Sequence, residues 1–182
     1  MIRTLLLLSI VLFWGCGETE PRKPIQVKSG SFYENSIERS KKLLQQEEQL
    51  ILAFIQRDSM NSYSISNNGF WYKFETKNET SDYELKTDDE VLLTYTLMSF
   101  NNDTLYSSDN IGIVQHAIDK SQLFPGLRNA VKLLKEGEKA TFLFPSSQAY
   151  GYKGDDNKIG PKTPIISSLE LLKILNKKDS LN

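Results

Sequence analysis

The chain has very few of the side chains on which most catalytic centres are built. Among its 182 residues there is one cysteine, Cys16, and one histidine, His116. These numbers exclude an internal disulfide framework, a cysteine metal site and a cluster of histidine ligands. His116 falls inside a strand-like stretch, where a lone histidine is more often structural than catalytic. We therefore predict no metal site.

The sequence also lacks the motifs of several common enzyme classes. No Gly-x-Ser-x-Gly elbow surrounds a serine, and no glycine-rich phosphate loop or dinucleotide fingerprint is present. The 22 basic and 23 acidic residues give a net charge of −1 without a basic run, so nothing indicates nucleic-acid binding. These absences argue against hydrolytic, nucleotide-dependent and cofactor-dependent chemistry, and we expect no cofactor and no nucleic-acid partner.

What the N-terminus does contain is the pattern of a lipoprotein signal. An apolar stretch at 5–14 ends at Gly15 and Cys16, and the chain then turns polar at once. Such a stretch is too short to span a membrane but suits a signal-peptide core. We predict a signal peptide over 1–15, lipidation of Cys16 and a polar tether over 16–30. An ordinary secretory signal and an uncleaved anchor are the alternatives.

The clearest helix prediction covers residues 33–57, within a helical arm at 31–68. Apolar residues recur there on one line at the helical period, namely Ile37, Leu44, Ile51 and Ile55. Charged and amide side chains fill the opposite face. The apolar stripe either packs on the protein's own domain or forms a seam with a client or a second copy, so a homodimer through the 33–57 helix is one alternative.

From Gly69 onward the apolar period changes from helical to alternating, which is typical of strands. One short helix is expected at 125–135, because Pro125 suits its first turn and Gly137 suits its end. The expected strands are 70–75, 90–100, 104–107, 111–118, 139–144 and 165–175.

The predicted fold class is α+β, in which an antiparallel sheet over residues 69–176 curls over the short helix. A polar tail follows at 177–182. For one strand, 139–144, the sequence does not decide which face is buried. The core side is either that of Ala140, Phe142 and Phe144 or that of Leu143.

One segment carries a recognisable motif. Leu123-Phe124-Pro125-Gly126-Leu127 precedes and opens the short helix, Glu136-Gly137-Glu138 follows it, and Ala149-Tyr150-Gly151 follows the next strand. With Thr94-Tyr95-Thr96 upstream and Ile159-Gly160-Pro161 downstream, the arrangement resembles the FKBP-type peptidyl-prolyl cis-trans isomerases over about residues 88–175. The resemblance implies an FKBP-like fold, isomerase activity on bonds that precede proline, and proline-containing polypeptides as partners.

The resemblance also implies which residues form the site. The catalytic set is Tyr95, Phe124 and Tyr150, and the substrate-binding set is Leu105, Tyr106, Leu123, Leu127 and Ile159. Without the motif, Tyr95 and Tyr150 read as core aromatics whose hydroxyls reach solvent. The departures from the family pattern imply a shallower, less aromatic pocket: Leu127 stands where Trp is usual, Tyr106 where Asp is usual, Ser167 where Phe is usual, and Val114 and His116 where aromatics are usual.

An apolar site without a nucleophile suits this reaction. Rotation about the bond before proline meets a barrier of ~18–20 kcal/mol, and the twisted amide loses resonance and charge separation. A dry site therefore favours the twisted form over the planar one. The Tyr150 hydroxyl would donate a hydrogen bond to the carbonyl preceding proline, and the backbone near Ile159 would donate a second.

The whole-chain arrangement resembles the gliding-motility-associated isomerase lipoproteins of the Bacteroidetes. This resemblance implies assistance to the folding of exported proteins of the envelope, including gliding or secretion machinery. Gly17 rather than Asp follows Cys16, so we expect a lipid anchor in the outer membrane that faces the periplasm. The alternative function is a holdase or assembly scaffold that binds proline segments with little turnover.

Overall fold

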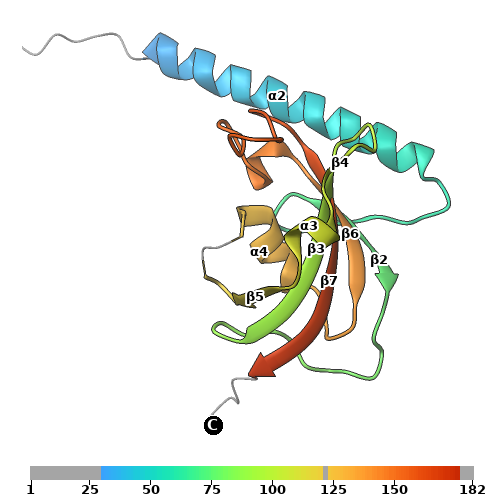
Figure 1. The fold of residues 1–182 in the computed structure, drawn as a ribbon. Coiled ribbons are helices and arrows are strands. Elements are labelled where there is room, and N and C mark those ends of the chain that lie inside the picture. Colours follow the sequence, from blue (N-terminus) through green and yellow to red (C-terminus); the bar gives the residue numbers. More distant parts are fainter. Residues whose placement is uncertain (1–29, 121–122, 177–182) are drawn as a thin grey trace, which may run out of the picture. The chain divides into compact units, whose positions relative to one another are not determined.

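In a computed structural model of the protein, the described residues are 30–120 and 123–176. The predicted signal peptide, Cys16 and the tail at 177–182 lie outside them. Chain contacts define two compact units, Met1–Glu38 and Arg39–Asn182, with the boundary inside the first described helix. The elements, labelled as in Figure 1, are α2 (Gly30–Arg57), β1 (Ser64–Ile65), β2 (Trp71–Thr76), β3 (Glu90–Met98), β4 (Thr104–Tyr106), α3 (Ser108–Ile111), β5 (Val114–Ala117), α4 (Pro125–Val131), β6 (Lys139–Phe144), the 3-10 helix η1 (Ser146–Gln148) and β7 (Ile165–Asn176).

Within the described residues of the second unit, seven strands form one sheet in the order β1-β2-β6-β7-β3-β4, and β5 pairs with β3. Every pairing is antiparallel. The long central pair, β3 and β7, extends from Glu90 opposite Asn176 to Met98 opposite Ile166, with register shifts between Glu90 and Val91 and between Leu92 and Leu93. The predicted α+β class, with an antiparallel sheet, a short helix and a preceding helix, is confirmed.

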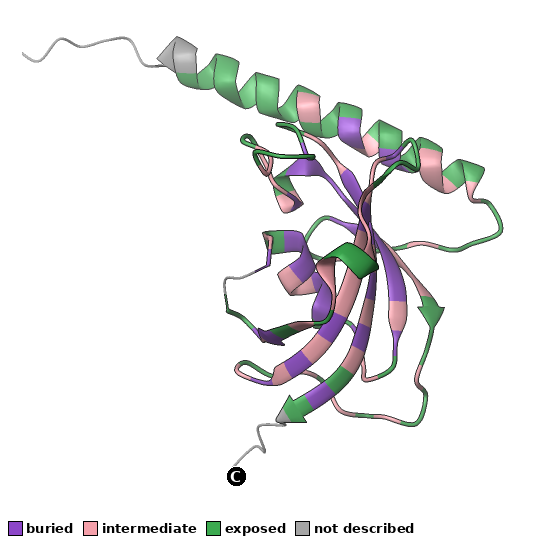
Figure 2. Ribbon diagram, viewed as in Figure 1, coloured by how far each residue is buried: buried purple, intermediate pink, exposed green. Residues whose placement is uncertain are grey.

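Strand β6 is buried along almost its whole length, and buried residues also occur along β3 and β7 (Figure 2). On one face Ala140, Phe142 and Phe144 join the larger core cluster with Leu127 of α4; we call this the α4 cluster. On the other face Leu143 joins Ile51, Trp71, Phe100 and Ile166; we call this the α2 cluster. Because successive side chains of a strand point to opposite faces, both predicted alternatives for 139–144 hold at once.

The apolar stripe of α2 packs on the protein's own sheet through the last part of the helix. Ile51 is fully buried, and Phe54 and Ile55 are half-buried in the α2 cluster. The interpretation in which the helix packs on its own domain is confirmed for this part, whereas Ile37 and Leu44 stay exposed. No helix of the described residues is long and apolar enough to cross a membrane.

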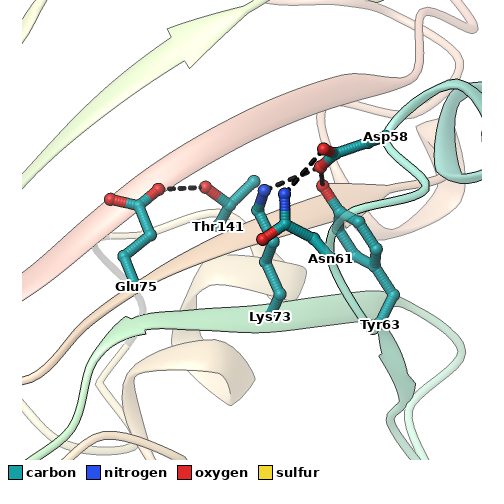
Figure 3. A network of polar contacts seen from close by, with 6 residues as sticks. All are labelled: Asp58, Asn61, Tyr63, Lys73, Glu75 and Thr141. Atoms are coloured by element: carbon teal, nitrogen blue, oxygen red, sulfur yellow. Dashed lines mark hydrogen bonds and ion pairs between the residues drawn. The ribbon is translucent and has the colours of Figure 1, made fainter.

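A polar network fixes the connection from α2 to β2 (Figure 3). The carboxylate of Asp58, directly after the helix, accepts hydrogen bonds from Lys73 Nζ at 2.7 Å, Tyr63 Oη at 2.8 Å and Asn61 Nδ2 at 2.6 Å. The hydrogen bond from Lys73 is the largest cause that lowers the pKa of Asp58 to about 2.

The short helix α4 is shorter than predicted. It ends at Val131 rather than at residue 135, because the next turn tightens: Leu133 N–H donates to Ala130 O, and Leu134 N–H donates to Val131 O. The buried carboxylate of Glu138 then accepts the N–H of Lys135 at 2.9 Å and draws the chain out of the helical path.

The strand predicted at 111–118 is shorter as well. The short helix α3, capped by the side chain of Ser107, extends to Ile111, and β5 begins only at Val114. At the N-terminal end of the described chain, α2 begins at Gly30, three residues before the predicted start, and ends at Arg57 as predicted.

Candidate active site

The structure brings all eight predicted site residues together in the α4 cluster. They come from β3, β4, the segment that enters α4, α4 itself, the turn after η1 and the loop before β7. The buried members are Leu123, Leu127 and Ile159, and the half-buried members are Tyr95, Leu105, Tyr106, Phe124 and Tyr150. The site is thus a partly exposed aromatic surface above an aliphatic floor.

Local sequence fixes the position of Phe124. Pro125 occupies the first turn of α4 and restricts Phe124 to an extended conformation, φ −65° and ψ 157°. Gly126 then allows a close approach, since a Cβ there would lie 2.6 Å from the Phe144 ring and from the carbonyl oxygen of Gln148. As a result the ring centroid of Phe124 lies 5.4 Å from that of Phe144 and 5.2 Å from that of Tyr150.

Tyr150 is the hydroxyl best suited to donate a hydrogen bond in this surface. Burial is the largest cause that raises its pKa to about 12, and the nearby Tyr95, Asp155 and Tyr106 contribute to the same shift. Burial also raises the pKa of Tyr95. Both hydroxyls therefore keep their protons at neutral pH, and each is available as a donor.

A carboxylate lies beside this surface. It belongs to Asp155 in the segment between η1 and β7, since β4 contains no acidic residue. The Tyr106 hydroxyl donates to Asp155 Oδ2, and Asp155 Oδ1 accepts the N–H groups of Ile159 at 2.7 Å and Asn157 at 2.9 Å. Burial alone would raise the pKa of Asp155, but these hydrogen bonds outweigh it and lower the pKa.

Asp155 therefore narrows one expectation about backbone donors and adds one residue to the site. The second donor to substrate was expected in the backbone near Ile159, and the N–H of Ile159 itself donates to Asp155. The sequence prediction missed Asp155 as part of the site. The Asp-x-Asn spacing, typical of a side chain that bonds the backbone two residues on, was the available signal.

Two of the departures from the family pattern, His116 and Ser167, are buried rather than exposed. His116 lies in the core, and neither ring nitrogen has a hydrogen-bond partner among the described residues. Burial lowers its pKa, and Arg128 lowers it further while Asp119 opposes this. Ser167 is also fully buried. The burial of His116 supports its interpretation as a structural residue.

Comparison with known families identifies this arrangement. The model of the family "FKBP-type peptidyl-prolyl cis-trans isomerase" matches residues 81–172. The chain belongs to this FKBP family. The match includes every predicted site residue and leaves α2, β1 and β2 outside.

One curated FKBP relative is the probable FKBP-type peptidyl-prolyl cis-trans isomerase FkpA of Neisseria meningitidis serogroup B. It is 46% identical over 54 residues, which are 30% of this chain and 20% of the relative. The aligned part of the chain thus spans about a fifth of the relative's length.

Two solved structures share the FKBP fold with this chain. A peptidyl-prolyl cis-trans isomerase from Pseudomonas syringae pv. tomato has a TM-score of 0.61 at 18% identity and covers 75% of this chain and 96% of its own. The N-terminal domain of FKBP42 from Arabidopsis thaliana has a TM-score of 0.56 at 15% identity and covers 63% of this chain and 93% of its own. The predicted FKBP-like fold is confirmed.

Proposed function

We propose that this FKBP-family protein catalyses the cis-trans isomerisation of peptide bonds that precede proline. The observation that carries the proposal is the half-buried group of Tyr95, Phe124 and Tyr150 above buried aliphatic side chains. An X–Pro segment on this surface loses water from its amide, and a dry environment favours the twisted, less polar amide. The reaction transfers no proton and uses no cofactor.

Tyr150 and Phe124 have different tasks in this proposal. The Tyr150 hydroxyl, protonated at neutral pH, donates a hydrogen bond to the carbonyl that precedes proline. The ring of Phe124 contacts that of Tyr150 and covers the bound proline, which keeps water out. Because Asp155 occupies the N–H of Ile159, the substrate carbonyl depends on Tyr150 rather than on a pair of donors.

The test is exchange NMR on a short X–Pro peptide with the chain from Cys16 onward. Catalysis predicts exchange well above the rate in buffer at micromolar protein. A rate equal to that in buffer, with shifts that still show peptide binding, would favour a holdase or scaffold. The departures at Tyr106, Leu127 and Ser167 are the features that favour this second candidate.

The proposed location is the cell envelope, with a lipid anchor on Cys16 in the outer membrane and the domain on the periplasmic side. The apolar stretch, Gly15-Cys16 and the polar tether support it. The proposed clients are exported proline-containing proteins, including gliding or secretion machinery, as the resemblance to the Bacteroidetes lipoproteins implies.

The anchor is tested by Cys16→Ser and membrane fractionation. We expect the variant to leave the membrane fraction or to accumulate as an uncleaved precursor, because the thiol is the attachment point of the acyl chains. Isomerase activity should be retained. A processed Cys16→Ser protein that stays in the membrane fraction would contradict the lipid anchor.

We also propose that α2 pairs with a second copy of the chain through its exposed apolar residues. Tyr33 is 65% exposed, Ile37 53% and Leu44 42%, although they follow the same apolar stripe as the buried Ile51. Sedimentation equilibrium of the chain from Cys16 onward tests this. A monomer at all accessible concentrations would exclude the pairing.

A further inference from the structure

One carboxylate of α2 is buried although it lies far outside the part of the chain that matches the FKBP family. The side chain of Glu47 is in contact with Ser146: Oε2 accepts the backbone N–H at 2.8 Å, and Oε1 accepts the hydroxyl at 2.6 Å. Glu47 is 5% exposed and Ser146 4%. Because a buried carboxylate is costly unless its oxygens are hydrogen-bonded, this pair holds one specific geometry.

Ser146 in turn organises the turn that carries Tyr150. It opens η1 after Pro145, which supplies no side-chain cap to this short helix. The carbonyl oxygen of Ser146 accepts the N–H of Ala149 at 3.1 Å and that of Gly151 at 2.8 Å, the two residues on either side of Tyr150. A shift of Ser146 therefore shifts both backbone groups that flank the proposed hydroxyl donor.

Packing beside this pair is incomplete. A cavity of about 320 Å³ opens next to Glu47 and Ser146, and Leu43, Gly151 and Tyr152 contribute to its lining. Because this space lies open beside the pair, the two hydrogen bonds are specific contacts that hold the turn against the helix.

We infer that Glu47 is a positioning residue for Tyr150. Through Glu47, α2 contributes to the activity of the isomerase site. The inference rests on the proposed isomerase function. Glu47 touches no reacting atom in this account. It acts through Ser146 by holding the turn in which the Tyr150 hydroxyl points at the substrate carbonyl.

The test is a double-mutant cycle in kcat/KM between Glu47→Ala and Tyr150→Phe, measured by exchange NMR on an X–Pro peptide. Glu47→Ala alone should lower kcat/KM by about threefold to tenfold, because misplacement of a positioned group weakens its effect in the transition state. In the Tyr150→Phe background the same change should cost little more, since the hydroxyl that it positions is already gone.

Two further variants separate positioning from packing. Glu47→Gln keeps an acceptor for the N–H of Ser146 and a group that can bond its hydroxyl, so it should restore most of the activity. Ile51→Val loosens the same helix within the α2 cluster without touching Ser146. It should lower the melting temperature and leave kcat/KM near wild type.

Each result decides the matter. Three outcomes would each overturn the positioning role. The losses from Glu47→Ala and Tyr150→Phe simply add, Glu47→Ala leaves kcat/KM unchanged, or Glu47→Ala and Glu47→Gln lower kcat/KM equally. An inactive wild type would refute the proposed function instead. In that case the ring signals of Tyr150 in ¹H–¹³C NMR decide: positioning predicts that they shift in Glu47→Ala and not in Ile51→Val.

Discussion

The two faces of the sheet are held in different ways. On the face of α4, aromatic and aliphatic side chains form the large α4 cluster, and the half-buried site residues lie at its edge. On the face of α2, a smaller apolar cluster is accompanied by polar side chains, with Asp58 bonded to Lys73 and Glu47 bonded to Ser146. The face of α4 thus offers apolar surface to a ligand. The polar contacts on the face of α2 instead fix the position of the helix and of the turn at Ser146.

This difference indicates which substitutions should change turnover and which should change stability. An apolar surface excludes water over an area, so loss of one ring opens the whole site. A directional hydrogen bond fixes one geometry, so its loss changes alignment more than water exclusion. Matched substitutions on the two faces should therefore separate turnover from stability.

The largest effect is expected for Phe124→Ala. Loss of the ring that contacts both Phe144 and Tyr150 admits water to the bound amide, and kcat/KM should fall by at least ~100-fold. Exchange NMR on an X–Pro peptide measures it, and circular dichroism checks the fold.

Phe54→Ala is the matched control for Phe124→Ala. Phe54 is also half-buried and also packs edge-to-face on another phenylalanine, Phe100, at 5.5 Å, but in the α2 cluster. It should lose stability and keep turnover in the folded molecules. Equal losses of kcat/KM in the two variants would show that the faces are not separate.

Leu143→Ala tests the helix face by its stability. Leu143 is fully buried in the α2 cluster, so the free energy of unfolding should fall by about 2–5 kcal/mol. Urea unfolding measures this, and kcat/KM below the unfolding transition should stay close to wild type. The matched change Leu127→Ala, in the α4 cluster under the site, should reduce both quantities. A Leu143→Ala protein with full stability would contradict the burial.

Tyr150→Phe should have a moderate effect. It removes one hydroxyl, and one hydrogen bond is worth about 0.5–1.5 kcal/mol, which corresponds to about two- to tenfold in kcat/KM. The same exchange assay measures it, with Tyr152→Phe at a largely exposed hydroxyl as control. If Tyr150→Phe proved more damaging than Phe124→Ala in a folded protein, polarisation rather than desolvation would dominate catalysis.

Local periodicity predicted the elements well where each element depends on its own residues. The strand at 139–144 has its predicted bounds, and α2 ends at the predicted Arg57. The predicted end of α4 was wrong because the turn around Val131 tightens, and the carboxylate of Glu138 then accepts the N–H of Lys135. The double burial of β6 was not apparent either, because the helix that covers Leu143 lies far away in the sequence.

The site residues were predictable from the motif, but their supports were not. The motif names Tyr150 and Tyr106 directly. Their partners, Glu47 through Ser146 and Asp155, are 99 and 49 residues away from the groups that they bind, and no local pattern marks such pairs. The Asp-x-Asn spacing marks the local turn of Asp155 but not its bond to Tyr106, because long-range polar contacts of this kind depend on the assembled fold.

The smallest effect is expected for Asp58→Asn, in the network between α2 and β2 (Figure 3). The pKa of Asp58 is about 2 in the folded protein against an ordinary value of 3.8, so its charge stabilises the fold above pH 3.8. That contribution is lost as the pH falls toward about 2. Urea unfolding should show Asp58→Asn less stable by about 1 kcal/mol at pH 7.

The dependence on pH is what distinguishes this network from ordinary packing. The difference between wild type and Asp58→Asn should close between pH 4 and pH 2, since protonation of Asp58 removes the same charge as the substitution. Asp82→Asn, at an exposed carboxylate, is the control and should change little at any pH. Turnover should stay at the wild-type value because the network contacts the connection between α2 and β2 rather than the site. A stability difference that is constant with pH would mean that the side-chain shape of Asp58, and not its charge, holds the helix in place.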